Sequence, residues 1–272
     1  MRNFLFYSLF FFPVYSFGQN IDTIKLKSCF GQFVGGVSIY DLNTNKCIRY
    51  NPEHCNKRFS PCSTFKIPNT LIGLQSGVIP DTGFVFKYDS IMHPKDSTKL
   101  ANEPFKHWYQ DLSLKMAFKY SCVWDYQELA RNVGLKKMKK YVTDLNYGNK
   151  DISSGLDSFW LCGSLQISIN EQIDFLKRLY LYKLNGITDN NIQAVKDIML
   201  NETTSEYKLY GKTGSGTCVD HKAIGWYVGF IETDSGMKIF AMNVIVNSYA
   251  DLKNNFQVQL TKKLLKELEI IN

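Results

Sequence analysis

Ser63 and Lys66 place a hydroxyl and an amine three residues apart, in the segment Ser63-Thr64-Phe65-Lys66. Pro61 precedes the pair and an apolar run with helical spacing follows it, so we expect a helix to begin here. Because positions i and i+3 share one face of a helix, Lys66 would reach the Ser63 proton directly or through one water. The free N–H groups of the helix start would favour the negative charge of an attacked carbonyl. The pair predicts an activated serine, although the pattern alone also fits a helix cap and a solvated lysine.

Two further motifs carry hydroxyl and amine groups. Ser121-Cys122-Val123 lies between two segments with helical spacing, and Lys212-Thr213-Gly214 lies at the end of a predicted strand. Alone, Ser121 also fits a cap or a loop serine. Gly211-Lys212-Thr213 matches the end of a phosphate-binding loop, but that loop needs glycine where Glu206 stands and a helix afterwards. A strand is expected there instead, so we reject nucleotide binding.

In chain order, the motifs S-x-x-K, S-x-V, Y-G-N and K-T-G resemble those of the penicillin-recognising serine enzymes. The Y-G-N motif is Tyr147-Gly148-Asn149. The flanking sequences are similar to those of the class D, oxacillinase-type, β-lactamases. These flanking sequences are residues 61–69, 126–131, 159–161 and 225–229. The resemblance covers essentially the whole chain after residue 18, and it implies a β-lactamase, a hydrolase that acts on cyclic amides.

The resemblance also implies a role for each motif. Ser63 would attack the carbonyl of a small-molecule β-lactam and become acylated, and water would then hydrolyse the ester. The N–H groups of Ser63 and Ser215 would form the oxyanion hole, and Ser121, helped by Lys212, would pass a proton to the leaving nitrogen. Lys212 and Thr213 would meet the substrate carboxylate. The residues expected to line the substrate site are Thr213, Gly214, Ser215, Val123, Trp160 and Leu161.

Lys66 is the residue for which the resemblance implies a modification. The family uses it as an N6-carboxylysine, formed with carbon dioxide or bicarbonate, and no other cofactor and no metal is expected. Phe65, Val123, Trp160 and Leu161 would surround the amine with apolar atoms. Desolvation lowers the pKa of a lysine and leaves the neutral amine that reacts with CO₂. Trp160 would donate its indole N–H to the carbamate, although a tryptophan is more often a core residue.

The C-terminal region departs from the family. The family places an arginine near the start of the last helix to hold the substrate carboxylate as a bidentate pair, but no arginine follows Arg178 here. Lys253 or Gln257 occupies that region. Lysine lacks the fork geometry of arginine, so we expect weaker or differently oriented binding of the substrate carboxylate.

The periodicity of the chain predicts strands near both ends around a helical middle. Strands are expected at 33–40, 47–50, 206–211, 223–232 and 237–246, and helices after Ser63 and at 114–120, 126–145, 190–200 and 253–271. Ser168 with Glu171 predicts a capping box.

This arrangement indicates an α/β fold of the α+β type. An antiparallel sheet built from both chain ends would be flanked by helices, with a helical lobe inserted, as in β-lactamases and transpeptidases. Residues 19–272 would form one catalytic domain. Its sheet lobe would cover about 19–84 and 165–272 and its helical lobe about 85–164, with a cleft between them.

Residues 1–18 are expected to be a secretory signal peptide. Arg2 is their single charge, residues 4–12 are almost wholly apolar, and Ser16-Phe17-Gly18 supplies the small residues of a cleavage site. The alternative is a buried N-terminal helix. No later stretch approaches the ~20 apolar residues of a transmembrane helix. We therefore expect an exported, most simply periplasmic, protein without a stable membrane span.

The net charge is a mild surplus of +7, which falls to +6 when Arg2 is removed. Four lysines within residues 136–140 alternate with apolar positions, which indicates the solvated face of a helix and not a nucleic-acid site. Nucleic acid is therefore not expected as a partner, and the chain is expected to be a monomer or a homodimer.

Seven cysteines are an odd number for a disulfide framework, and none forms a C-x-x-C pair, so a structural zinc site is not expected. Cys47 and Cys55 flank a polar turn and are the candidate disulfide. Cys29, Cys162 and Cys218 follow no pattern. Most of the cysteines are therefore expected to be small buried apolar residues.

The same motifs also fit a penicilloyl-binding sensor domain, which is acylated once, or a transpeptidase. A sensor would be attached to transmembrane helices, whereas this chain is expected to have only a removable leader. Val123 is apolar, whereas a polar residue at this position would resemble the sensor pattern. Both features favour turnover. Nothing in the sequence favours a non-enzymatic binding module.

Overall fold

The computed structural model describes residues 23–272. The predicted signal peptide lies outside this part of the chain, so export through a cleaved leader stays a prediction. Within residues 23–272, no helix combines the length and the apolar character that are needed to span a bilayer.

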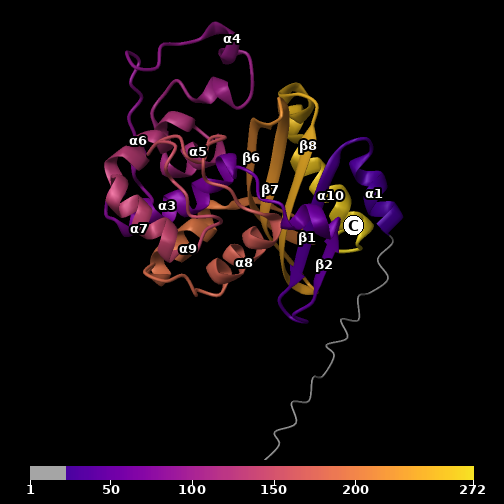
Figure 1. Ribbon diagram of the computed structural model, residues 1–272. Coiled ribbons are helices and arrows are strands. Elements are labelled where there is room, and N and C mark those ends of the chain that lie inside the picture. Colours follow the sequence, from indigo (N-terminus) through magenta and orange to yellow (C-terminus); the bar gives the residue numbers. More distant parts are fainter. Residues whose placement is uncertain (1–22) are drawn as a thin grey trace, which may run out of the picture.

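A six-stranded antiparallel sheet gathers strands from both ends of the chain (Figure 1). Its strand order is β2-β1-β8-β7-β6-β5. The strands are β1 (Val34–Asp41), β2 (Cys47–Tyr50), β5 (Leu200–Thr203), β6 (Tyr207–Val219), β7 (Lys222–Thr233) and β8 (Gly236–Val246). The predicted N-terminal hairpin and the predicted fold class are confirmed.

Strand β6 is longer than predicted. The expected strand ended at Gly211, but the pairing with β7 continues through Lys212↔Val228 and Gly214↔Trp226 to Val219↔Lys222. The loop that follows consists of Asp220 and His221, both with positive φ, as a two-residue hairpin turn requires. The polar and glycine-rich residues of this segment have low strand propensity, so the pairing partner is what makes it a strand. The K-T-G motif consequently lies within a strand and not at its end.

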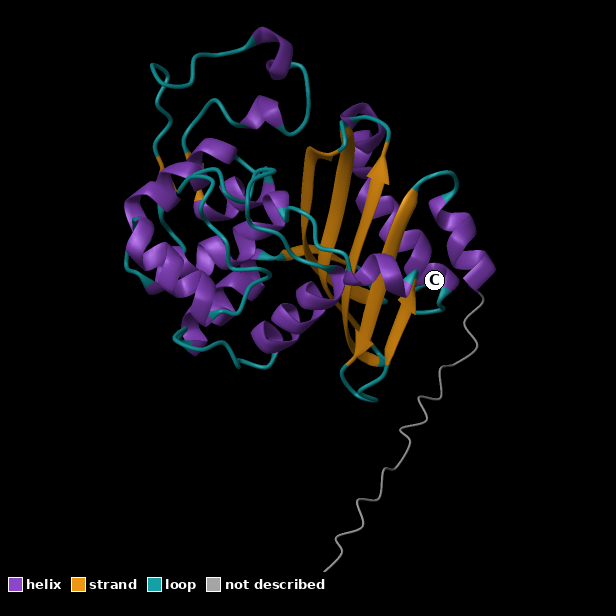
Figure 2. Ribbon diagram, in the orientation of Figure 1, coloured by secondary structure: helices purple, strands orange, loops and turns teal. Residues whose placement is uncertain are grey.

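Helices cover both faces of the sheet (Figure 2). On one face, α1 (Thr23–Phe30) and α10 (Phe256–Glu267) pack against each other and bury residues such as Tyr227. On the other face, Trp226 and Val228 belong to the larger hydrophobic core, together with the remaining helices. Neighbouring residues of β7 thus point to opposite faces, as the period of two in a strand requires.

The helical layer next to the sheet places α3 at its centre, packed against α6, α7 and α9. Its helices are α3 (Lys66–Gln75), α5 (Leu114–Lys119), α6 (Val123–Val133), α7 (Leu135–Asp144), α8 (Ile169–Tyr180) and α9 (Asp189–Ile198). The shorter elements are α2 (Pro52–Asn56), η1 (Cys62–Phe65), β3 (Val85–Phe86), α4 (Ser97–Leu100), η2 (Phe105–His107), β4 (Leu112–Ser113) and η3 (Tyr249–Asn255).

The bounds of two predicted helices differ from those in the structure. The predicted helix at 126–145 is two helices, because Gly134 adopts φ 79° and interrupts the ladder. The last helix, predicted at 253–271, spans Phe256–Glu267. It does not begin at Lys253, because Asn254 and Asn255 are both left-handed at φ 56°. The capping box of Ser168 and Glu171 is confirmed.

The predicted pairing of Cys47 with Cys55 was also wrong, since both thiols are free and the disulfide joins Cys162 to Cys218. The Cys47 sulfur lies 3.2 Å from the Ser38 hydroxyl. The Cys55 thiol is buried and donates to the Tyr50 carbonyl at 3.3 Å. The two sulfurs therefore have separate partners, a tertiary feature that their spacing in the sequence does not show.

Candidate active site

Ser63 lies in the 3₁₀ turn η1, which runs directly into α3. Lys66, the first residue of α3, donates a hydrogen bond from Nζ to Ser63 Oγ at 3.3 Å. The contact predicted from the S-x-x-K spacing is therefore present. The turn is tight and Cys62 adopts φ 49°, a left-handed conformation that costs free energy in a residue with a side chain.

The Lys66 side chain is completely buried. Its Nζ lies 4.9 Å from the centroid of the Tyr126 ring, and the ring of the preceding Phe65 stacks on Trp160. Loss of hydration lowers the pKa of Lys66 from its usual 10.5 to about 8. The fraction of neutral amine at pH 7 is consequently about 300-fold larger than for a solvated lysine.

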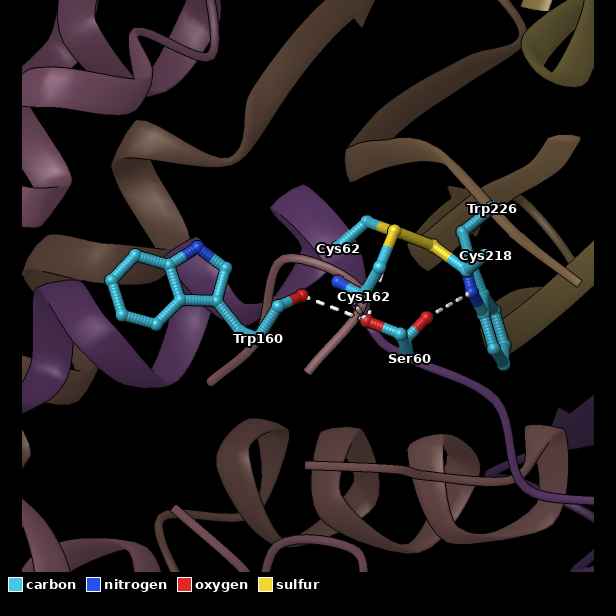
Figure 3. Close-up of a disulfide and its surroundings, with 6 residues drawn as sticks. All are labelled: Ser60, Cys62, Trp160, Cys162, Cys218 and Trp226. Carbon is cyan, nitrogen blue, oxygen red and sulfur yellow. Dashed lines mark hydrogen bonds between the residues drawn. A yellow bond between two sulfur atoms is a disulfide. The ribbon is translucent and has the colours of Figure 1, made fainter. Parts of the chain in front are cut away.

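Trp160 contributes an unpaired donor to this apolar region. Its side chain is fully buried, and its indole Nε1 has no hydrogen-bond partner within the described chain. The Trp160 carbonyl accepts from Ser60 Oγ at 2.8 Å, and the Ser60 carbonyl accepts from the indole of Trp226 at 3.0 Å (Figure 3). The backbone around Trp160 is thus fixed while its indole N–H remains unsatisfied, which is costly for a buried donor.

Lys212 and Ser121 form a second pair of amine and hydroxyl. Lys212 Nζ donates to Ser121 Oγ and, at 3.1 Å, to the carbonyl of Thr213. Lys212 is buried in β6, and burial, followed by the charge of Lys66, lowers its pKa well below the usual value. Ser121 adopts φ 56° in the turn between α5 and α6. Two amines and two hydroxyls from separate segments therefore meet in one site.

The strand β6 packs against η1, the turn that carries Ser63. A Cβ built on Gly214 would lie 2.7 Å from the Pro61 carbonyl and 3.0 Å from the Thr64 methyl, so only glycine permits this approach. The next residue, Ser215, is partly buried. Val123 and Leu161 are also partly buried and pack against the larger core.

Gln257, and not Lys253, contacts the part of β6 that is predicted to bind substrate. Gln257 Nε2 donates to Ser215 Oγ at 3.4 Å, and its buried Oε1 has no partner within residues 23–272. Lys253 is exposed and has an extended backbone, with φ −60° and ψ 161°. Of the two residues expected in place of the missing arginine, Gln257 is therefore the one beside the site.

Asp125 is a site residue that the sequence reasoning missed. It is buried on α6, its Oδ2 has no partner in the described part of the chain, and burial raises its pKa to about 6. Its charge acts on Lys66 and opposes the lowering of that pKa, but the two groups do not form an ion pair. The sequence does contain a sign of this residue: Asp125 stands four residues before Leu129 and eight before Val133, which places a carboxylate on the core face of an amphipathic helix.

The arrangement suits acyl transfer. A hydroxyl lies beside a desolvated amine that can accept its proton, and a second hydroxyl lies beside a second amine that can supply one.

Comparison with known proteins agrees with this chemistry. Residues 33–267 match the family model described as the penicillin binding protein transpeptidase domain. The chain is 39% identical over 237 residues to beta-lactamase OXA-48 of Klebsiella pneumoniae, which covers 87% of this chain and 84% of that protein. It is 32% identical to the regulatory protein BlaR1 of Bacillus licheniformis, over 84% of this chain and 36% of that protein.

A solved structure of a class D beta-lactamase from Sebaldella termitidis is similar over most of its length. It gives a TM-score of 0.82 at 38% identity and covers 91% of this chain and 96% of the other. The family match, the relatives and the structural neighbour agree with the resemblance that the four motifs indicated. The chain belongs to the class D β-lactamases, within the family of penicillin-binding protein transpeptidase domains.

Proposed function

We propose that this chain is a serine β-lactamase that hydrolyses the amide bond of β-lactam antibiotics through an acyl-enzyme on Ser63. The observation that carries the proposal is the buried amine of Lys66 at 3.3 Å from the Ser63 hydroxyl. A lysine in water is protonated at neutral pH and cannot accept a proton, whereas this one has a neutral fraction large enough to do so.

Acylation uses both pairs. As Ser63 Oγ attacks the lactam carbonyl, its proton passes to Lys66, and the negative charge on the carbonyl oxygen is held by the N–H groups of Ser63 and Ser215. When the C–N bond breaks, Ser121 gives its proton to the ring nitrogen and receives one from Lys212, to which it is hydrogen bonded. Burial and the charge of Lys66 lower the pKa of Lys212, so its ammonium form is a stronger acid than that of a solvated lysine.

We further propose that Lys66 carries an N-carboxyl group formed with carbon dioxide. Burial enlarges the neutral fraction of this amine, which the reaction requires, and the unpaired indole N–H of Trp160 offers a donor for a carboxylate oxygen. Satisfying that donor removes the free-energy cost of a buried unpaired group. When present, the carbamate supplies a carboxylate-like general base for the water that hydrolyses the acyl-enzyme.

Recognition of the substrate carboxylate would involve Lys212, Thr213 and the amide of Gln257. A neutral amide donor next to Ser215 is weaker than the bidentate arginine of the family. The proposal therefore keeps the expectation of weakened anchoring and replaces Lys253 by Gln257.

The alternatives, a sensor acylated once or a transpeptidase, predict a different time course. A chromogenic cephalosporin mixed with purified protein should give many turnovers per molecule, accelerated by added bicarbonate. A single stoichiometric burst without further hydrolysis would identify the sensor behaviour instead. Ser63→Ala, which should form no product above background, is the control.

A further inference from the structure

Three cysteine sulfurs from distant parts of the sequence meet at η1, the turn that carries Ser63 (Figure 3). Cys162 and Cys218 form a disulfide, and the free thiol of Cys62 lies 3.7 Å from the Cys218 sulfur. All three sulfurs lie within 4.8 Å of one another. Cys62 belongs to η1, Cys162 follows Trp160 in the loop before α8, and Cys218 lies near the end of β6. The cluster thus joins three segments that carry site residues.

Gly216 provides the space that these sulfurs occupy. A Cβ built on Gly216 would lie 2.8 Å from the sulfur of Cys218 and 2.9 Å from those of Cys162 and Cys62. The three sulfurs therefore surround one point at nearly equal distances. A disulfide needs only two of them, whereas three converging cysteine sulfurs would, once the disulfide is reduced, offer a thiophilic metal ion three of its ligands.

The cluster is accessible from one side. Cys162 is exposed, Cys218 is partly buried and Cys62 is buried. A small dithiol can therefore reach the Cys162–Cys218 bond from solvent. Thiol–disulfide exchange would then convert the protein disulfide into two thiols and the dithiol into its own disulfide, leaving three thiols at the site.

We propose that the reduced chain binds one thiophilic d¹⁰ cation, of the class of Zn²⁺ and Cd²⁺, through Cys62, Cys162 and Cys218. Each thiol loses its proton as its bond to the cation forms, and the fourth position, on the exposed side of Cys162, is taken by water or an added thiol. This inference departs from the expectation of no metal, which relied on the absence of C-x-x-C pairs. The fold supplies the ligands from residues that are far apart in the sequence.

The sulfur separations fit this assignment. Zinc–sulfur bonds of about 2.3 Å in a tetrahedron place ligand sulfurs about 3.8 Å apart. The 3.7 Å between Cys62 and Cys218 already matches that value, and reduction releases Cys162 from Cys218.

The test uses the full chain, reduced with a dithiol that is then removed without air, and Cd²⁺ as the probe. Titration should give a thiolate-to-cadmium absorption band that saturates at one equivalent, while the unreduced protein gives none. Binding should release about three protons per cadmium at neutral pH. An absent or non-saturating band, an equal band in the unreduced protein, or release of only two protons would overturn the site.

Variants assign the ligands. Cys62→Ser should weaken cadmium binding by about tenfold or more, whereas Cys29→Ser, a matched control on α1 outside the cluster, should bind like the wild type. Unchanged affinity in Cys62→Ser would reduce the site to an ordinary reduced pair and contradict the proposal. The proton count on the wild-type chain gives the same decision should Cys62→Ser fail to fold.

Discussion

At the scale of single residues, the environment of Lys66 determines the chemistry. Burial lowers its pKa to about 8, and the buried carboxylate of Asp125 acts in the opposite direction. The amine is therefore poised between the ammonium and neutral forms near neutral pH. The S-x-x-K spacing predicted the contact with Ser63, but it could not reveal Asp125, whose effect depends on which face of α6 is buried.

The first prediction concerns pH. Carboxylation needs the neutral amine. With a pKa of about 8, the neutral fraction of Lys66 falls from about one half at pH 8 to about one tenth at pH 7 and one hundredth at pH 6. At a constant concentration of dissolved CO₂, carboxylation and the rate that depends on it should fall with decreasing pH in this window. The steady-state rate measured at several pH values with controlled CO₂ checks this, and a profile that is flat between pH 6 and 8 would contradict it.

A second prediction concerns Asp125. Asp125→Asn removes a negative charge that favours the ammonium form of Lys66 and opposes an added carboxylate, so half-maximal activation should need less bicarbonate, by a few-fold or more. Glu128→Gln changes an exposed acid on the same helix and serves as the control. A larger bicarbonate requirement in Asp125→Asn would show that this carboxyl supports the modification.

At the scale of elements, β6 places Lys212 and the predicted substrate-binding residues Thr213 to Ser215 next to η1. The hairpin of β1 and β2 and the capping box of α8 were predictable, because each depends on local residue types. The extension of β6 to Val219, the break at Gly134 and the Cys162–Cys218 pair were not, because pairing partners and tertiary position decide them. The start of α10 was not predictable either. The sequence therefore could not show that Gln257, and not Lys253, lies beside Ser215.

The third prediction tests that choice. Gln257→Arg should restore a charged, bidentate donor beside Ser215 and lower KM for a β-lactam by about tenfold. Lys253→Ala should leave KM unchanged, because Lys253 is exposed and lies in the kink before α10. Michaelis kinetics on both variants decide the matter, and a raised KM in Lys253→Ala alone would reverse the assignment.

The fourth prediction concerns the disulfide. It links the loop of Trp160 to β6 across 56 residues of sequence, and such a cross-link stabilises a fold by about 2–4 kcal/mol. Cys162→Ser should lower the free energy of unfolding by that amount in urea titrations under air, and reductant should then have little further effect. Equal stability of Cys162→Ser and wild type, both unreduced, would show that the bond does not stabilise the fold.

At the scale of the whole molecule, the sheet and the helical layer bring together segments that are far apart in the chain. Ser63 and Lys66 come from η1 and α3, Ser121 from the turn before α6, and Lys212 from β6. The larger hydrophobic core extends around Phe65, Phe118 and Trp160, which keeps water away from both amines. Export to the periplasm and a monomeric or homodimeric state stay predictions.

The most direct test follows the acyl group on the protein during hydrolysis. Intact-mass spectrometry at successive times after mixing with a β-lactam should show a transient adduct on the wild type, mapped to the Ser63 peptide, while product accumulates over many turnovers. Lys66→Ala should lose turnover, and any adduct that it forms should persist. Hydrolysis at the wild-type rate in Lys66→Ala, or an adduct on a residue other than Ser63, would contradict the account.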